Sequence, residues 1–388
     1  MDPEMLAEFR RRMVKAGEAA LAAIDPATGM ADLGLTRHRN QRVSYLLAWL
    51  YRTEFEGNSH HGDGRVLDAA LACGEAAFAL QNQRGGFDLD DEVEQGDSWS
   101  AYYLARTAEV LGRDGLGEER WASWRDRLER WTECLGGRAF FYASPNHEAW
   151  KCATLEVIGT VFDLPAARRL ADFHMTQLLR CQMPPGFWEE NRQHGPSTSY
   201  NYVSAEPLHI FWKSTGRKDV LQALERLVAH MTRYALPDGS TSGALDGRVH
   251  YRPGRVSPSV TVTAAGRRLN ELGWQHWVSV RGGAGPATVD LVRFWNDGEA
   301  EPIPAETDGS VVEEHDGFFN ALARRQGPWH TVLSGVFSDV TKETDNVYRL
   351  ERQSRIDLWH QRAGLLIGGG SVHRSVEPHL ANLFVDTG

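Results

Sequence analysis

Apolar residues recur at helical spacing from the start of the chain to about residue 235. Apolar positions three and four residues apart form one stripe on each helix, as in helices that pack against a core. Short Gly-, Asp- or Pro-containing links separate the segments, which predicts a succession of antiparallel helical hairpins. The predicted helices cover residues 3–24, 38–56, 64–82, 98–112, 118–135, 146–161, 165–181, 203–215 and 218–235. So many hairpins without a repeat of fixed length favour a closed or horseshoe-shaped α/α toroid over a four-helix bundle or a solenoid.

The pattern changes after residue 236. A Gly-, Pro- and Ser-rich stretch predicts a long loop, and two further helices are expected at 258–272 and near 287–296. From about residue 310, short runs of alternating polarity between turn residues predict antiparallel strands. These runs are 317–325, 329–337, 355–361, 364–372 and 382–387. We therefore expect a mainly α protein, with a toroidal catalytic domain over residues 1–275 and a smaller antiparallel β domain or layer over 276–388.

The composition is that of a chain able to bury a large core. Of 388 residues, 41% are apolar and 24% are charged, and 42 Lys and Arg face 52 Asp and Glu for a net charge of −10. An acidic chain without a long basic run is not expected to bind nucleic acid. No apolar run approaches the ~18 residues of a membrane span, so no membrane partner is expected.

The cysteines and the N-terminus say little about the compartment. Cys73, Cys134, Cys152 and Cys181 lie far apart without a Cys-x-x-Cys pair, which favours free thiols over a zinc site. The first residues are charged and amphipathic and lack the apolar core of a signal peptide. The chain is then cytoplasmic, or periplasmic or secreted if a signal peptide has been removed.

The stretch Ser144-Pro145-Asn146-His147-Glu148-Ala149-Trp150 carries a helix-start signal. Ser144 is the expected N-cap and Pro145 fits the first turn. Asn146 and His147 then lie where free N–H groups and the helix dipole favour a ligand carboxylate. The plainer interpretation is that both residues only cap the helix.

A second polar stretch, residues 186–202, is expected to be a loop at one rim of the toroid. It is dense in groups that hydrogen-bond a sugar or move a proton, including Trp188, Glu189, Arg192, Tyr200 and Tyr202. A guanidinium near a phenol lowers its pKa, which makes Tyr200 a candidate base. The alternative is a solvated loop whose tyrosines pack against the next helix.

Together the two stretches resemble the α/α-toroid polysaccharide lyases. The alginate-lyase branch carries an Asn-Asn-His-x-x-Trp motif, followed later in the chain by an Arg and a catalytic Tyr. Residues 145–150 match this motif except that Pro145 replaces the first Asn, and Tyr200 follows His147 by 53 residues with Arg192 between them. The heparinase-like branches add a β domain after the toroid, so this chain is similar to both.

The resemblance implies β-elimination in a glycan that contains uronic acid. Such a lyase neutralises the uronate carboxylate, removes the proton at C5 and protonates the leaving O4. Asn146, His147 and Arg192 would neutralise the carboxylate. Tyr200 would be base and acid in a syn elimination, whereas in an anti elimination His147 would be the base. The uronate, the linkage, endo or exo action and the oligomeric state stay open, and no cofactor is expected.

Further residues are candidates for binding an acidic polysaccharide or oligosaccharide. Exposed aromatic rings stack on sugar faces, which points to Trp188 above all and then to Trp150 and Trp99. Arg84 would attract further uronates. The heparinase-like branches use a β-domain histidine near the cleft, which makes His330 a candidate. No His-x-His or His-x-x-x-His spacing supports a metal site.

Three rival functions remain. A glycoside hydrolase on the same toroid would use two carboxylates. Its candidates are Asp88, Asp90, Asp91 and Asp97, paired with Glu189 or Glu190. An isoprenoid-cyclase-like toroid would need an apolar cavity, which the polar loop at 186–202 disfavours. A non-catalytic carbohydrate-binding protein is the third.

Overall fold

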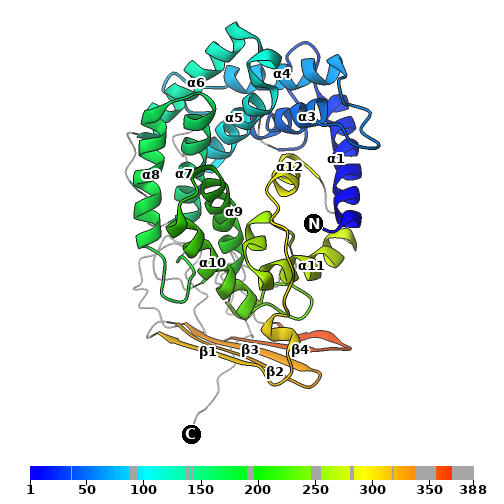
Figure 1. Cartoon of the computed structure of the whole chain (residues 1–388), viewed down its shortest axis with the longest axis vertical. Helices are drawn as coiled ribbons and strands as arrows, with labels where there is room; N and C mark the ends of the chain where they lie inside the picture. The colour runs from blue at the N-terminus through cyan, green and yellow to red at the C-terminus, as the bar shows by residue number, and fades with distance from the viewer. Residues whose placement is uncertain are drawn as a thin grey trace.

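The computed structural model describes residues 1–35, 37–87, 95–136, 140, 144–189, 196–245, 255–279, 284–316, 319–336 and 355–368. Helices joined by short links form a ring of hairpins, with a β-sheet at one end (Figure 1). This arrangement confirms the predicted α/α toroid with a smaller β layer. The ring contains α1 Pro3–Ala23, α2 Arg37–Asn40, α3 Val43–Arg52, α4 Gly64–Ala79, α5 Gln95–Leu116, α6 Glu118–Gly136, α7 Pro145–Val161, α8 Pro165–Arg180, α9 Thr198–Thr215, α10 Lys218–Arg233, α11 Ala264–Ser279 and α12 Pro286–Arg293.

Two kinds of helix build the ring. In α7 nearly every residue of 145–159 is buried, as expected for a helix surrounded by others. The next helix, α8, buries one stripe that includes Ala167, Ala171 and Leu178. α3, α5, α7 and α9 contact one another in that order and form the inner wall, with α4, α6, α8 and α10 outside. Because each outer helix reverses the chain, the inner helices run parallel and their N-terminal ends share one rim.

Some predicted helix bounds were wrong. The segment 38–56 forms two helices, α2 and α3, and ends at Arg52. The segment 258–272 begins with the 3-10 turn η2 (Pro258–Val262) and continues as α11 to Ser279. α9 starts at Thr198 and not at residue 203. In each case polar residues begin or interrupt the helix, so the apolar period does not mark its bounds.

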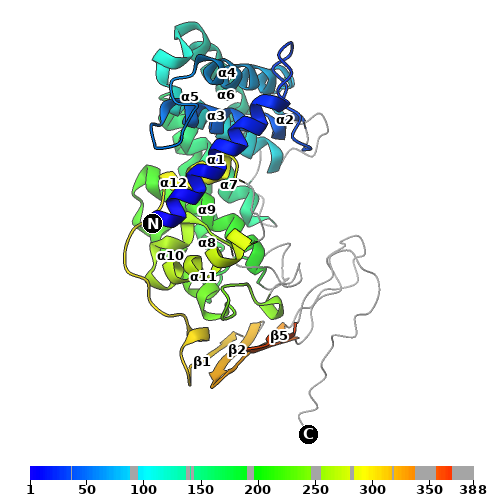
Figure 2. The ribbon, with the colours of Figure 1, turned by 90° about the vertical axis from the view of Figure 1, so that its right-hand side faces the viewer.

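The ring is closed by its first and last helices. Phe9 of α1 packs against Trp274 and Trp277 of α11, with ring centroids 5.1 and 4.7 Å apart. α12 contacts both α1 and α3 and lies inside the ring in Figure 1. In Figure 2, α1 crosses the side of the ring obliquely. The N-terminal helix is therefore part of the toroid core.

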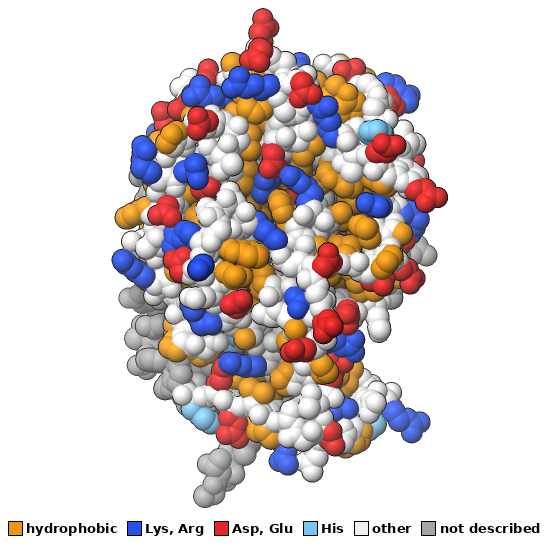
Figure 3. All heavy atoms as spheres, in the orientation of Figure 1, with side chains coloured by type: hydrophobic (Ala, Val, Ile, Leu, Met, Phe, Trp, Pro, Cys, Tyr) orange, Lys and Arg blue, Asp and Glu red, His pale blue; other side chains and the backbone are white. Residues whose placement is uncertain are grey.

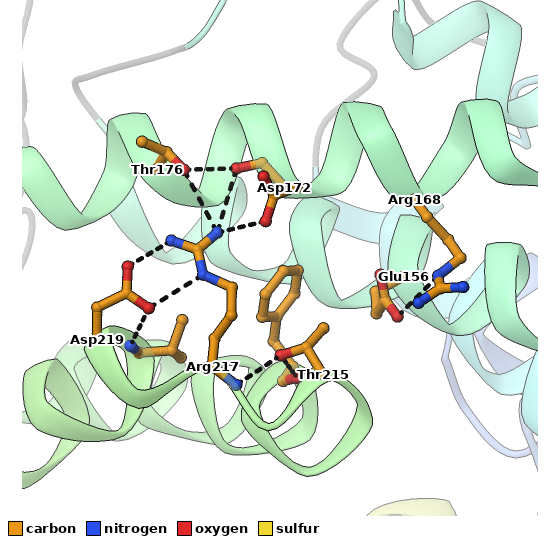
Figure 4. A network of polar contacts seen from close by, with 9 residues as sticks. Glu156, Arg168, Asp172, Thr176, Thr215, Arg217 and Asp219 are labelled. Carbon is orange, nitrogen blue, oxygen red and sulfur yellow. Dashed lines mark hydrogen bonds and ion pairs between the residues drawn. The ribbon is translucent and has the colours of Figure 1, made fainter.

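Polar contacts tie the hairpins together where α9 ends (Figure 4). Arg217, in the turn between α9 and α10, binds Asp172 of α8 at 2.6 Å and Asp219 of α10 at 2.5 Å. Arg168 of α8 lies 3.4 Å from the buried Glu156 of α7. These contacts fix the rim opposite the N-terminal ends of the inner helices.

The sheet is an antiparallel meander in the order β1-β2-β3-β4-β5. Its strands are β1 Val311–Asp316, β2 Phe319–Gln326, β3 Trp329–Val336, β4 Arg355–His360 and β5 Gly364–Ile367. Four predicted strands are confirmed, β1 was not predicted, and the run 382–387 lies outside the described residues. Ala321, Ala323 and Val332 are buried, whereas their neighbours along the strands are more exposed. One face of the sheet is thus covered by the toroid.

A buried carboxylate joins the sheet to the toroid. Asp357 of β4 accepts hydrogen bonds from Ser242 Oγ at 2.6 Å and from the Ala244 N–H at 3.1 Å. Those residues lie in or beside the 3-10 turn η1 (Gly243–Leu245), and the Leu245 carbonyl accepts a bond from Thr198 Oγ1 at the start of α9. The division at residue 275/276 stays a prediction, with described helices continuing to Arg293 and strands beginning at Val311.

The surface carries charges of both signs. Figure 3 shows positive and negative side chains interspersed over one face. None of the helices in the described part of the chain is long and apolar enough to cross a membrane. All four cysteines are free thiols, as predicted, and Cys73 and Cys152 are buried.

Candidate active site at the amino-terminal ends of the inner helices

The predicted helix start at Ser144 is confirmed. Pro145 begins α7, so Asn146 and His147 lie in its first turn. Ser144 holds the N-cap position through its carbonyl, which accepts bonds from the N–H groups of His147 at 3.0 Å and Glu148 at 3.3 Å. Asn146 is fully buried and His147 is partly exposed. Of this pair, the histidine is the one placed to meet solvent or a ligand.

A buried ionic cluster supports this first turn from behind. Glu148 contacts Lys151 Nζ at 2.7 Å and His174 Nδ1 of α8 at 3.2 Å. All three side chains are at least 94% buried. Removing one member of such a cluster leaves an uncompensated charge in the interior. The cluster therefore fixes the start of α7 against α8.

Tyr200 lies in the first turn of α9 and not in a loop as predicted. Its N–H donates to the Ser197 carbonyl at 2.9 Å, and its side chain is partly exposed. The sequence signal for the earlier start is Ser197, which occupies the N-cap position. Because α7 and α9 are neighbours and run parallel, His147 and Tyr200 belong to the same rim. Arg192 lies outside the described residues.

A cavity of about 400 Å³ lies within the toroid next to these helix starts. It is lined by the second and third turns of α5 and α9, by the second turn of α7, by the residue preceding α3, by the segment before η2 and by α1, α11 and α12. Asn146, His147 and Tyr200, in the first turns of α7 and α9, are not among its described lining residues. The described lining residues are Phe9, Arg42, Trp99, Tyr103, Trp150, Tyr202, Val203, Glu206, Arg255, Val256, Ser257, Pro258, Trp277, Ala287, Thr288 and Leu291. The structure thus brings together the predicted Trp99, Trp150 and Tyr202.

Two buried polar atoms at this cavity make no hydrogen bond to any of the described residues. Trp150 is 2% exposed and Tyr202 is 3% exposed. Within the described parts of the chain, neither the Trp150 indole N–H nor the Tyr202 hydroxyl makes a hydrogen bond. Buried polar groups are normally satisfied, so such a pair at a cavity is suited to a polar ligand.

Three charged groups line the same cavity. The Arg42 guanidinium lies 5.3 Å from the Trp99 ring centroid, and that of Arg255 lies 5.8 Å from the Tyr202 ring. Burial and, to a smaller extent, the negative charge of Asp290 raise the pKa of Glu206 to about 8, against the opposing charge of Arg255. Glu206 is therefore mostly neutral at pH 7, while the arginines stay charged.

A buried polar network, here called the floor, lies next to the cavity lining, and its Asp290 acts electrostatically on Glu206. Asp290 of α12 accepts hydrogen bonds from the hydroxyls of Tyr45 at 2.8 Å and Tyr102 at 2.9 Å. Arg106 Nε donates to the Tyr102 hydroxyl at 3.0 Å and Arg293 Nη1 to that of Tyr45 at 2.8 Å. Burial raises the pKa of Asp290 and of both tyrosines. These groups satisfy one another and hold α12 in the ring.

Other predicted binding residues do not line the cavity. Trp188 is 2% exposed, and its indole N–H donates to the Leu178 carbonyl at 2.9 Å, so it packs in the core rather than against a sugar. Arg84 is exposed on a turn next to α6. His330 belongs to strand β3 and is fully buried, and burial lowers its pKa to about 4. We leave these three out of the proposed site.

Glu189 is partly exposed, and its backbone forms an isolated antiparallel β-bridge with Pro196. This β-bridge brings together the two ends of the stretch before α9. Asp88, Asp90, Asp91 and Glu190, which the hydrolase alternative needs, lie outside the described residues, as does the Asp97 side chain. Across the described segments, no group of three His, Cys, Asp or Glu side chains is arranged to hold a metal ion.

Arg42, Glu206 and Arg255 were missed by the sequence interpretation. They come from three separate parts of the chain and form no local motif. One signal was present for Glu206, which lies four residues after Tyr202 and three after Val203 and so shares their helix face. Nothing local distinguishes Arg42 from Arg37 or Arg39.

The fold is the α/α toroid found in polysaccharide lyases. Chondroitin AC lyase of Streptomyces coelicolor A3, in complex with chondroitin sulphate, matches with a TM-score of 0.56 and 16% identity over 93% of this chain and 54% of that one. A variant of that lyase with one tyrosine changed to alanine matches with a TM-score of 0.61 and 15% identity over the same shares.

Heparinase III matches with a TM-score of 0.51 and 12% identity over 84% of this chain and 49% of that one. This chain thus spans about half the length of these enzymes. No family model and no curated protein matches it. The likeness is one of fold.

Proposed function

We propose that the protein is a lyase that cleaves uronic-acid-containing glycans by β-elimination. The observation that carries the proposal is the cavity itself. Inside a toroid of the polysaccharide-lyase type, tryptophan and tyrosine rings and two arginines surround a space beside the first turns of α7 and α9. Aromatic walls suit sugar rings, and guanidinium groups suit carboxylates.

In the proposed reaction His147 neutralises the uronate carboxylate, with the positive end of α7 behind it. The predicted contact of Asn146 with this carboxylate is left out, because Asn146 is fully buried. The C5–H bond then breaks, its electron pair forms the C4–C5 double bond, and the C4–O4 bond breaks. Tyr200 gives a proton to O4 in either stereochemistry. It also takes the C5 proton in a syn elimination, whereas His147 takes it in an anti elimination. Arg192, which lies outside the described residues, stays a proposed source of positive charge for the carboxylate.

The hydrolase alternative has less support. A glycosidase of this kind needs two carboxyl groups across the scissile bond. Among the described lining residues of the cavity only Glu206 carries a carboxyl group. Asp290 lies behind it, buried and bonded to two tyrosines.

The test measures the formation of an unsaturated product through its near-ultraviolet absorbance. The substrates are alginate, glucuronan, pectic polymers, heparinoids and chondroitin sulphate. Tyr200→Phe should abolish turnover and largely spare binding, because only the proton-transfer oxygen is lost. Tyr51→Phe, in α3 and away from the cavity lining, is the matched control and should keep its activity.

Full activity of Tyr200→Phe would remove the tyrosine from the mechanism. Release of saturated sugars from one of these polymers would instead identify a hydrolase. Binding without any cleavage would identify a carbohydrate-binding protein.

A further inference from the structure

The inference concerns Glu206, which the proposed chemistry does not use. Its side chain lines the toroid cavity, and no hydrogen bond among the described residues involves its carboxyl group. It is thus an acidic group placed where an anionic sugar would bind. An ionised carboxylate there would repel a uronate, whereas a neutral one would donate a hydrogen bond.

The other charged and titratable side chains among the described lining residues come from separate parts of the chain. Arg42 precedes α3, Tyr103 belongs to α5, Tyr202 is on its own helix, and Arg255 precedes η2. Asp290 of α12 acts on it from the floor. The only positive groups among these are the two arginines, so a bound carboxylate is expected to lie toward them.

The rest of the cavity offers partners for an uncharged sugar ring. The Trp150 indole N–H and the Tyr202 hydroxyl are buried without a partner among the described residues. A pyranose hydroxyl both donates and accepts, so it can satisfy each of these atoms and a neutral carboxyl group. The cavity volume of about 400 Å³ is within the range of small-ligand sites.

We propose that Glu206 is a specificity-determining residue of a uronate subsite. It hydrogen-bonds a hydroxyl of the bound sugar in its neutral form, while Arg42 and Arg255 face the carboxylate. Ionisation of Glu206 then expels the anionic sugar. The proposal rests on the proposed function for its substrate class.

The expected size of the effect follows from the fraction of neutral Glu206. With a pKa of about 8, nearly all of it is neutral at pH 6 and about one part in eleven at pH 9. If only the neutral form binds, the apparent affinity falls about tenfold between these pH values. The carboxylate of glucuronic acid is ionised throughout this range, so the ligand does not contribute.

The experiment measures binding of D-glucuronate to the full chain at pH 6 and pH 9 by calorimetry. Circular dichroism at both pH values confirms that the protein is folded. The wild type should lose about tenfold in affinity, and Glu206→Gln, which stays neutral and keeps a donor, should change less than twofold. Arg255→Gln should weaken glucuronate binding at pH 6 and leave binding of the uncharged D-glucuronamide unchanged.

An equal loss of affinity in Glu206→Gln would overturn the proposal, as would the absence of glucuronate binding in the wild type at pH 6. Glucuronate has no glycosidic bond to cleave, so this result is independent of the polymer assay. If polymers yield unsaturated products but the glucuronate affinity does not depend on Glu206, only the subsite proposal is refuted. If glucuronate binds as predicted but no polymer yields an unsaturated product, only the lyase proposal is refuted.

Discussion

Replacing Glu206 with Gln should stabilise the protein, and by more as the pH rises. Folding raises the pKa of this carboxyl from 4.5 to about 8, chiefly by burial. The folded state therefore holds a proton that the unfolded state releases, and stability falls as pH rises between these values. The cost of keeping Glu206 is about 1 kcal/mol at pH 5, about 3 at pH 7 and about 5 at pH 9. These are upper values, because water in the cavity screens the charge.

Urea unfolding of both proteins at pH 5, 7 and 9 checks this prediction. Far-UV circular dichroism and tryptophan fluorescence are followed together, because a toroid and a sheet need not unfold in one step. The matched control is Glu18→Gln on the exposed side of α1, whose effect should be small and constant with pH. A difference for Glu206→Gln that does not grow with pH would show that the arginines already stabilise an ionised Glu206.

Two further changes test the supports of the site. Asp357→Ala removes the acceptor of the hydrogen bonds from Ser242 Oγ and the Ala244 N–H, so we expect the free energy of unfolding to fall by about 2–3 kcal/mol. The same turn holds the start of α9 through Thr198. We therefore also expect lower turnover on the substrate that the polymer assay identifies. Lys151→Met leaves the buried Glu148 without its closest cation and should cost about 3–5 kcal/mol by urea unfolding, whereas Glu148→Gln in the same chain should restore much of it.

The toroid could be predicted from sequence because its helices carry their own signals. Each outer helix has a single apolar stripe, and Pro145 and Pro165 mark the starts of α7 and α8. The strands of the sheet alternate because one face is covered. β1 escaped prediction because Glu313, Glu314 and His315 interrupt the apolar pattern of an edge strand.

The cavity could not be predicted in the same way. Helical spacing shows that Trp99 and Trp150 each lie on an apolar face, but it does not say which face borders a space. For Trp188 the polar loop around it predicted exposure, whereas the side chain is buried. Trp188 donates a hydrogen bond to the Leu178 carbonyl of α8, whereas the rings of Trp150 and Trp99 pack edge to face at the cavity wall with centroids 5.5 Å apart. That difference depends on how separate hairpins meet, which no local pattern records.

The charged residues around the cavity fall into two groups, the buried network of the floor and the lining residues, and the two groups differ in net charge. In the floor, Asp290 and Glu109 are matched by Arg106 and Arg293, with contacts of 2.9 Å from Glu109 to each arginine. Above it, the described lining carries two arginines and one carboxyl group, and that group is mostly neutral at pH 7. Because Arg106 and Arg293 oppose the negative charge of Asp290, we expect the charged residues of the lining to decide the sign of the ligand. The positive ends of α7 and α9 act in the same direction. The cavity is therefore expected to favour an anion more strongly below pH 8 than above it, and the protonation of one carboxyl group, that of Glu206, sets the difference.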